Sequence, residues 1–104
     1  MFGAVANRKE RFSQDSSPLY IHDIDYEGEH ISLSVPLKVE ITGYGFGKFQ
    51  VKSEELCIWG LGRTVDAAKY DFCGAFMGLY ELAMQYHPRT NRQLSEVLYH
   101  VGVI

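Results

Sequence analysis

The 104-residue chain lacks the features that mark several classes of protein. Its two cysteines, Cys57 and Cys73, are too few for a disulfide framework or for a zinc site of grouped cysteines and histidines. No stretch approaches the ~20 apolar residues of a membrane helix, and the N-terminus lacks the pattern of a secretory signal. A formal charge of -3 lacks the basic excess of a dedicated nucleic-acid binder. We therefore expect a reduced, soluble, cytoplasmic protein with no membrane contact, while binding of nucleic acid by a local basic patch stays open.

The length of the chain favours a single domain, because domains commonly run ~100–150 residues. Residues 1–17 show no periodicity and end in turn-forming residues before Pro18. We expect a flexible tail over residues 1–17 and one domain over residues 18–104.

Alternation of apolar and polar residues is the clearest pattern in the chain. It runs from Ile31 to Thr42 without a miss and predicts a strand of an antiparallel sheet with one buried side. Pro36 has no N–H to donate, so the strand lies at a sheet edge there or is interrupted. A preceding strand over residues 19–26 and a turn at Glu27-Gly28 predict a hairpin.

Two shorter strands are predicted next. The glycines of Gly43-Tyr44-Gly45-Phe46-Gly47 favour a hairpin turn, since a phosphate-binding loop would lead into a helix. Residues 48–52 resume the alternation. Leu56-Cys57-Ile58-Trp59-Gly60 reads as a strand that is apolar on both faces, and we expect the Trp59 ring to add area to the core.

After Gly62 the apolar period changes to that of a helix. Thr64 is a suitable N-cap, and an apolar stripe continues towards His87-Pro88, where proline ends the helix. A second, shorter helix capped by Thr90 would place one apolar side inward, formed by Leu94, Val97, Leu98 and Val101. The fold class is α+β: an antiparallel meander of four to five strands, one long helix across one face and a short C-terminal helix.

Few residues form a pattern that suggests catalysis. The histidines are scattered, and no two have the helical i, i+4 spacing: His22, His30, His87 and His100. The two cysteines suit packing. We expect no metal, no cofactor and no catalytic residue. The carboxylates are the enzymatic alternative, because Asp23 and Asp25 share a strand face and Glu40 lies on the next strand, so a two-metal site is conceivable.

Two surfaces are candidates for binding a partner. The solvent-facing side of the central hairpin carries Lys38, Lys48, Gln50 and Lys52, which suit phosphates or an acidic protein surface, although nearby glutamates offset their charge. Gly74 and Gly78 lie on the predicted outer face of the long helix, where each costs about 0.5–1 kcal/mol relative to alanine. We expect something to approach there, either the C-terminal helix or a second protein, with Tyr70 and Met77 flanking the contact.

Residues 37–86 resemble the HicB-like antitoxin family, which has a partial ribonuclease-H-like fold. The similarity lies in the strand Leu37–Ile41, the glycine-aromatic turn, the returning strand and the helix entry Gly62-Arg63-Thr64-Val65-Asp66-Ala67-Ala68. Too few residues follow Pro88 for the separate DNA-binding segment that many members carry.

The resemblance implies a non-catalytic protein that binds a small ribonuclease toxin, covers its active site and forms homo-oligomers. It implies contacts through the sheet or the outer helix face, at Lys38, Lys48, Gln50, Lys52, Tyr70, Gly74 and Gly78. The alternative is a ribonuclease-H-like module that binds nucleic acid or acts as a metal-dependent nuclease. The enzyme hypothesis requires Asp23, Asp25 and Glu40 to converge. A structural subunit that works only as an oligomer is a third possibility.

Overall fold

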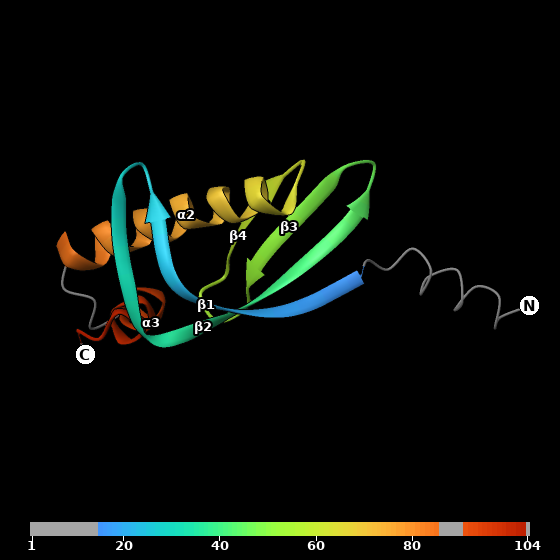
Figure 1. Ribbon diagram of the computed structural model, residues 1–104. Coiled ribbons are helices and arrows are strands. Elements are labelled where there is room, and N and C mark those ends of the chain that lie inside the picture. Colours follow the sequence, from blue (N-terminus) through green and yellow to red (C-terminus); the bar gives the residue numbers. More distant parts are fainter. Residues whose placement is uncertain (1–14, 86–90, 104) are drawn as a thin grey trace, which may run out of the picture.

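The structure is a computed structural model that describes residues 15–85 and 91–103. Four strands form one antiparallel sheet in the order β1-β2-β3-β4, and two helices follow. The elements are β1 (Asp15–Tyr26), β2 (Glu29–Gly45), β3 (Lys48–Ser53), β4 (Ile58–Gly62), α2 (Val65–Gln85) and α3 (Arg92–Val101). Figure 1 shows α2 running along one side of the sheet and α3 beside the middle of β2, where that strand bends. The predicted α+β class, the meander and both helices are confirmed.

The sheet begins earlier than the sequence pattern indicates. Residues 1–14 of the expected tail lie outside the described residues, but Asp15, Ser16 and Ser17 belong to β1, where Asp15 pairs with Gly43. The hydroxyl oxygens of Ser16 and Thr42 lie 3.0 Å apart and form a hydrogen bond between the strands. Thr42 is consequently buried, although it lies on the side of β2 that we expected to face solvent.

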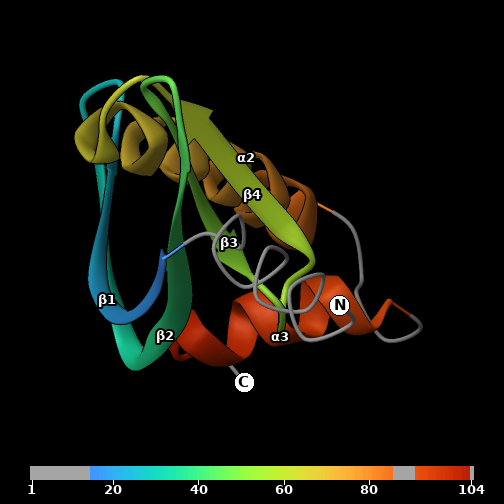
Figure 2. The same cartoon turned by 90° about the vertical axis from the view of Figure 1, so that its right-hand side faces the viewer.

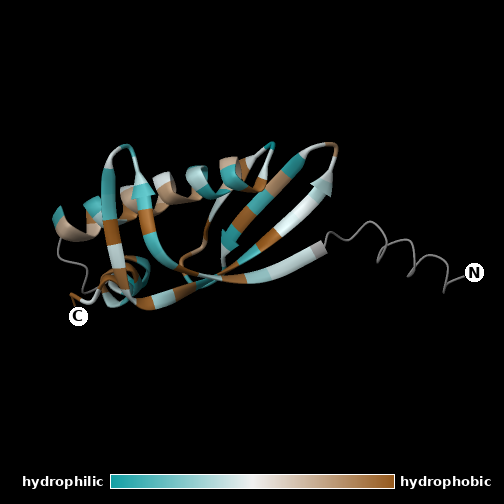
Figure 3. Cartoon of the chain, viewed as in Figure 1, coloured by the Kyte–Doolittle hydropathy of each residue, from teal (hydrophilic) through white to brown (hydrophobic). Residues whose placement is uncertain are grey.

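The long β1–β2 hairpin bends at its middle. Ile21 pairs with Leu37 but Asp23 pairs with Ser32, so residues 33–36 of β2 stand opposite His22 alone. Pro36 falls inside this interruption, as its missing N–H predicted. The bend carries the tip of the hairpin towards α2 (Figure 1). The apolar and polar bands along β2 are visible in Figure 3.

The last strand lies two residues later than predicted. Residues 54–57 form a turn, so Cys57 is exposed in that turn with a φ of 56° and does not lie in a strand. Leu56 is nevertheless fully buried, and its amide donates to Ser53 Oγ at 3.0 Å. A side chain within a turn therefore anchors the β3–β4 connection to the core.

Helix α2 packs against the backbone of β4. A Cβ placed on Gly60 would lie 2.7 Å from Phe72 Cα, and one on Gly62 would lie 2.7 Å from Ala67 Cβ. The two glycines, spaced two residues apart on one face of the strand, let the helix approach where side chains would hold it away. Thr64 caps the helix as predicted, accepting from the Ala67 amide at 3.0 Å.

The core differs from expectation at two side chains. Trp59 is 53% exposed, so its ring does not supply the core, whereas Met77 is 5% exposed and does not belong to an outer contact surface. Trp59 points away from α2 because its neighbour Gly60 faces the helix, and side chains alternate along a strand. The largest fully buried rings are those of Phe72 and Phe76.

Helix α3 is capped by Asn91. The Asn91 side chain accepts from the Leu94 amide at 3.0 Å, while the expected cap Thr90 and the expected helix end at His87-Pro88 lie outside the described residues. Gly102 ends the helix with a φ of 85°, the left-handed conformation that glycine adopts readily. The predicted inward side is confirmed, since Leu94, Val97 and Leu98 are buried. Figure 2 shows α3 below the sheet, beside β2.

Candidate functional site

The side of the sheet turned away from α2, here called the outer face, carries the predicted lysines together. On β3, Lys52 lies between Glu40 of β2 and Trp59 of β4. In the same way, Gln50 lies between Thr42 and Leu61. On β2, Lys38 pairs with Tyr20 of β1. Directly paired residues in an antiparallel sheet point to the same side. The outer face therefore brings together residues from all four strands.

The outer face also holds large apolar side chains that the sequence analysis did not place there. Tyr20, Trp59 and Leu61 are each more than half exposed. A pocket of about 280 Å³ adjoins Leu61, and its lining is Tyr44, Lys48, Phe49, Leu61, Gly62 and Arg63. Large exposed apolar side chains mark candidate protein-interaction surfaces, and aromatic rings are enriched there. The signal was present in the sequence as the alternation of Gly60 and Gly62 with Trp59 and Leu61.

The lysines of the outer face differ in their surroundings. Lys52 Nζ lies 2.9 Å from Glu54 Oε2, and this hydrogen bond raises the lysine pKa above its ordinary value. Lys38 and Lys48 have no ion-pair partner within the described residues. Gln50 accepts a hydrogen bond from the Tyr44 hydroxyl at 2.8 Å. Positive charge on this face therefore remains at its two ends.

At the second predicted surface, around Tyr70, Gly74 and Gly78, a residue of the same chain approaches the helix. The group that approaches Gly74 is the ring of Tyr26 from β1, which a Cβ on Gly74 would meet at 2.8 Å. The Tyr26 and Tyr70 ring centroids are 4.8 Å apart. Neither α3 nor a second protein is needed to explain this glycine, and a Cβ on Gly78 would meet nothing within 4 Å.

Tyr70 is held in place by an acidic residue of the β1–β2 turn. Its hydroxyl donates to Glu27 Oε2. This hydrogen bond raises the pKa of Tyr70 to about 12, with smaller contributions from desolvation and the Glu27 charge. The tip of the hairpin is thereby fastened to α2.

The three carboxylates of the enzymatic alternative do not come together. Asp25 Oδ1 lies 2.6 Å from His30 Nδ1, and Asp23 Oδ1 lies 3.4 Å from His30 Nε2. Glu40 is in the other half of the hairpin, paired with Pro18 on one side and Lys52 on the other. Asp23 lies five positions after Pro18 along β1, a separation of roughly 16 Å in an extended strand. No shared metal site of these three acids exists among the described residues.

The exposed His30 cluster leads to a prediction about protonation. The hydrogen bond that His30 donates to Asp25, and then the Asp25 charge, raises the pKa of His30 above 6.5. Stability from this contact is fully present below pH ~6.5 and is lost as the pH rises through the raised folded pKa. We expect Asp25→Asn to lower the His30 pKa, measured by NMR titration of its ring protons. An unchanged His30 titration in the variant would contradict this assignment.

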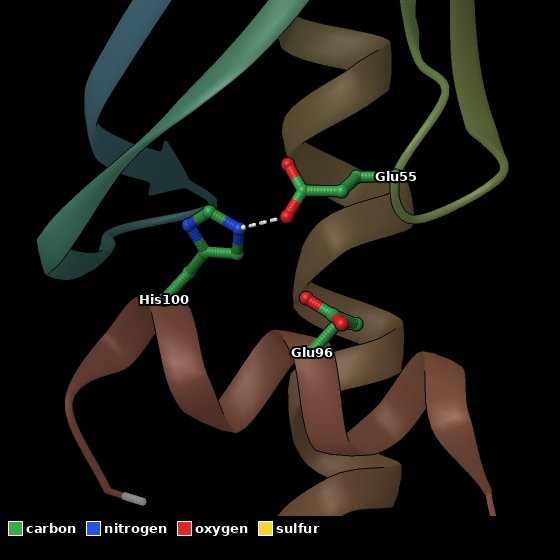
Figure 4. A group of neighbouring side chains, drawn as sticks. All are labelled: Glu55, Glu96 and His100. Atoms are coloured by element: carbon green, nitrogen blue, oxygen red, sulfur yellow. Dashed lines mark hydrogen bonds and ion pairs between the residues drawn. The ribbon is translucent and has the colours of Figure 1, made fainter.

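A third group of side chains, here called the Glu-Glu-His cluster, lies between α3 and the 54–57 turn. It comprises Glu55, Glu96 and His100, with one donor atom of each within 4.8 Å of the others. Figure 4 shows the three side chains converging from the turn and from one face of α3. Glu55 and Glu96 also line a pocket of about 540 Å³, together with Glu54, Leu56, Cys57, Arg92 and Gln93.

His100 is the buried member of this cluster, 2% exposed. Its Nδ1 donates to the Val35 carbonyl at 2.9 Å, and its Nε2 lies 3.0 Å from Glu55 Oε2. The interruption of β2 frees that carbonyl from strand pairing. Sequence reasoning missed the cluster because it compared histidines only with one another. The available signal was Glu96 and His100, four residues apart on a predicted helix.

Comparisons with known proteins give no information on the function of these sites. No family model, no curated protein and no solved structure matches the chain. Within residues 15–85 and 91–103, neither helix is long and apolar enough to cross a bilayer.

Proposed function

We propose that this chain is a non-catalytic protein-interaction domain that binds a partner protein through the outer face of its sheet. The observation that supports this most is the exposure of large apolar side chains on both edge strands of this face, Tyr20 on β1 and Trp59 and Leu61 on β4, with lysines on the strands between them. Large exposed apolar side chains on one face favour contact with another protein. The free charges of Lys38 and Lys48 favour carboxylates at the rim of the partner.

The resemblance to HicB-like antitoxins suggests which partner this is. On this proposal the chain binds a small ribonuclease and blocks it, and the outer face supplies the contact. A ribonuclease encoded beside the gene of this chain is the first partner to test.

The test compares two double variants that remove similar exposed apolar area. Trp59→Ser with Leu61→Ser alters the outer face, and Leu82→Ser with Met84→Ser alters exposed positions of α2. We expect the wild-type chain and the α2 variant to inhibit RNA cleavage by the neighbouring ribonuclease. The outer-face variant should bind at least about tenfold more weakly, since truncating buried aromatic contacts costs the most.

Circular dichroism and sedimentation of each variant would serve as controls for folding and self-association. Equal inhibition by both double variants would contradict a role for the outer face. A neighbouring gene that encodes no ribonuclease, or a ribonuclease unaffected by the wild-type chain, would contradict the antitoxin function. Loss of self-association in the outer-face variant alone, without any ribonuclease effect, would identify a second copy as the occupant.

A further inference from the structure

We propose that the Glu-Glu-His cluster binds a divalent transition-metal cation, with zinc as the preferred ion. The ligands would be Glu55 from the β3–β4 turn and Glu96 and His100 from α3. The ion would tie the C-terminal helix to the turn that anchors the core through Leu56. Glu55 also lines a pocket with Lys38, Glu40 and Lys52 of the outer face, but the metal proposal does not depend on the proposed partner.

The contacts of His100 call for a proton or a cation between Nε2 and Glu55. A backbone carbonyl can only accept, so Nδ1 carries a proton that it donates to Val35. The neutral ring then points the Nε2 lone pair at the Glu55 carboxylate, 3.0 Å away. Two lone pairs do not attract each other, so either a proton or a metal ion lies between them.

A divalent metal ion would balance more of the local negative charge than a proton does. A second proton on His100 balances one carboxylate, whereas a divalent ion with a neutral imidazole balances both Glu55 and Glu96. Glu54 is paired with Lys52, while Arg92 lines the same pocket as the two glutamates and Lys38 lines a neighbouring pocket with Glu55, so these cations share the carboxylate charge with a bound ion. The Glu96 carboxylate has no hydrogen-bond or ion-pair partner within the described residues, so it is available as a ligand.

The hydrogen bond of His100 to the backbone is of a kind found at known metal sites. A metal-binding histidine usually donates its other ring N–H to a carboxylate or a backbone carbonyl, which fixes the tautomer. The bond from Nδ1 to Val35 is such a contact, and the burial of His100 makes the ring rigid. The pocket provides space for water to complete the coordination, as in sites with three protein ligands.

The distances fit after small side-chain rotations. Donor atoms around a tetrahedral zinc lie roughly 3.3 Å apart, because each bond is about 2.0–2.2 Å long. The three donor atoms lie within 4.8 Å of one another. Glu55 is exposed and Glu96 half-buried, so both carboxylates have freedom to close this gap. One imidazole with two carboxylates suits zinc better than magnesium, which prefers oxygen ligands and water.

Calorimetry of the full, untagged chain with zinc chloride tests the proposal. After treatment with a chelator, we expect one zinc ion to bind per chain, with tighter binding than manganese and no measurable binding of magnesium. At a zinc concentration one hundred times the dissociation constant, the melting temperature should rise by at least about 10 °C.

Two variants distinguish this cluster from adventitious binding. Glu96→Gln keeps the hydrogen bonds of His100 to Glu55 and Val35. It should weaken zinc binding by at least about tenfold, because losing a residue that only supports a metal ligand already lowers metal affinity by that factor. His30→Gln removes the exposed histidine-aspartate cluster and should leave zinc affinity unchanged. Wild-type protein that binds no zinc, zinc binding unaffected by Glu96→Gln, or binding abolished by His30→Gln would each overturn the proposal.

Discussion

Gly60→Ala is expected to destabilise the fold by about 3 kcal/mol or more, the upper range for overpacking. The added methyl would lie 2.7 Å from Phe72 Cα and closer still to the Phe72 nitrogen and the Ala68 carbonyl. These are backbone atoms, so no change of rotamer relieves the clash. The helix would have to move away from the strand, losing contacts along α2 and β4. Chemical denaturation measures the loss.

Gly78→Ala is the matched control for that experiment. A Cβ on Gly78 would meet nothing within 4 Å, and alanine is the better helix former by about 0.5–1 kcal/mol. We expect this variant to be slightly more stable than the wild type. If Gly60→Ala does not fold, its circular dichroism will show a loss of helix. Wild-type stability of Gly60→Ala would contradict the direct packing of α2 on β4.

Phe72→Ala is expected to cost about 3–5 kcal/mol, the usual range for truncating a buried phenylalanine. Phe72 is fully buried and lies where α2 meets β4. Removing the ring leaves a cavity that the surrounding backbone cannot fill. The midpoint of urea denaturation should fall, with the slope unchanged if unfolding remains two-state.

Trp59→Ala is the informative comparison, because Trp59 is the larger ring and the sequence alone places it in the core. Its side chain is 53% exposed in the structure. We expect a stability loss of less than about 1 kcal/mol, within the range of surface substitutions. A loss equal to that of Phe72→Ala would show that the outer face is packed against another part of the chain.

The sequence pattern predicted the position of some candidate site residues and not of others. Period-two alternation placed the lysines on one side of the sheet, because that pattern is local and each residue needs only its neighbours. Trp59 was misplaced because its segment is apolar on both faces, so alternation gives no direction. The decisive residues were Gly60 and Gly62, which mark the helix side by having no side chain. Gly74 was assigned to an interface because nothing local shows that the hairpin bend brings Tyr26 to it.

The sequence by itself determined the order of elements, their periodicity and therefore the α+β class. Alternation from Ile31 to Thr42 and the helical stripe after Thr64 contain that information within a few residues. Only the tertiary structure decided that Glu55 and His100 meet, and that the Val35 carbonyl supports the ring. The physical reason is that such contacts depend on how bent strands and helices pack, and no local spacing records the distance between elements.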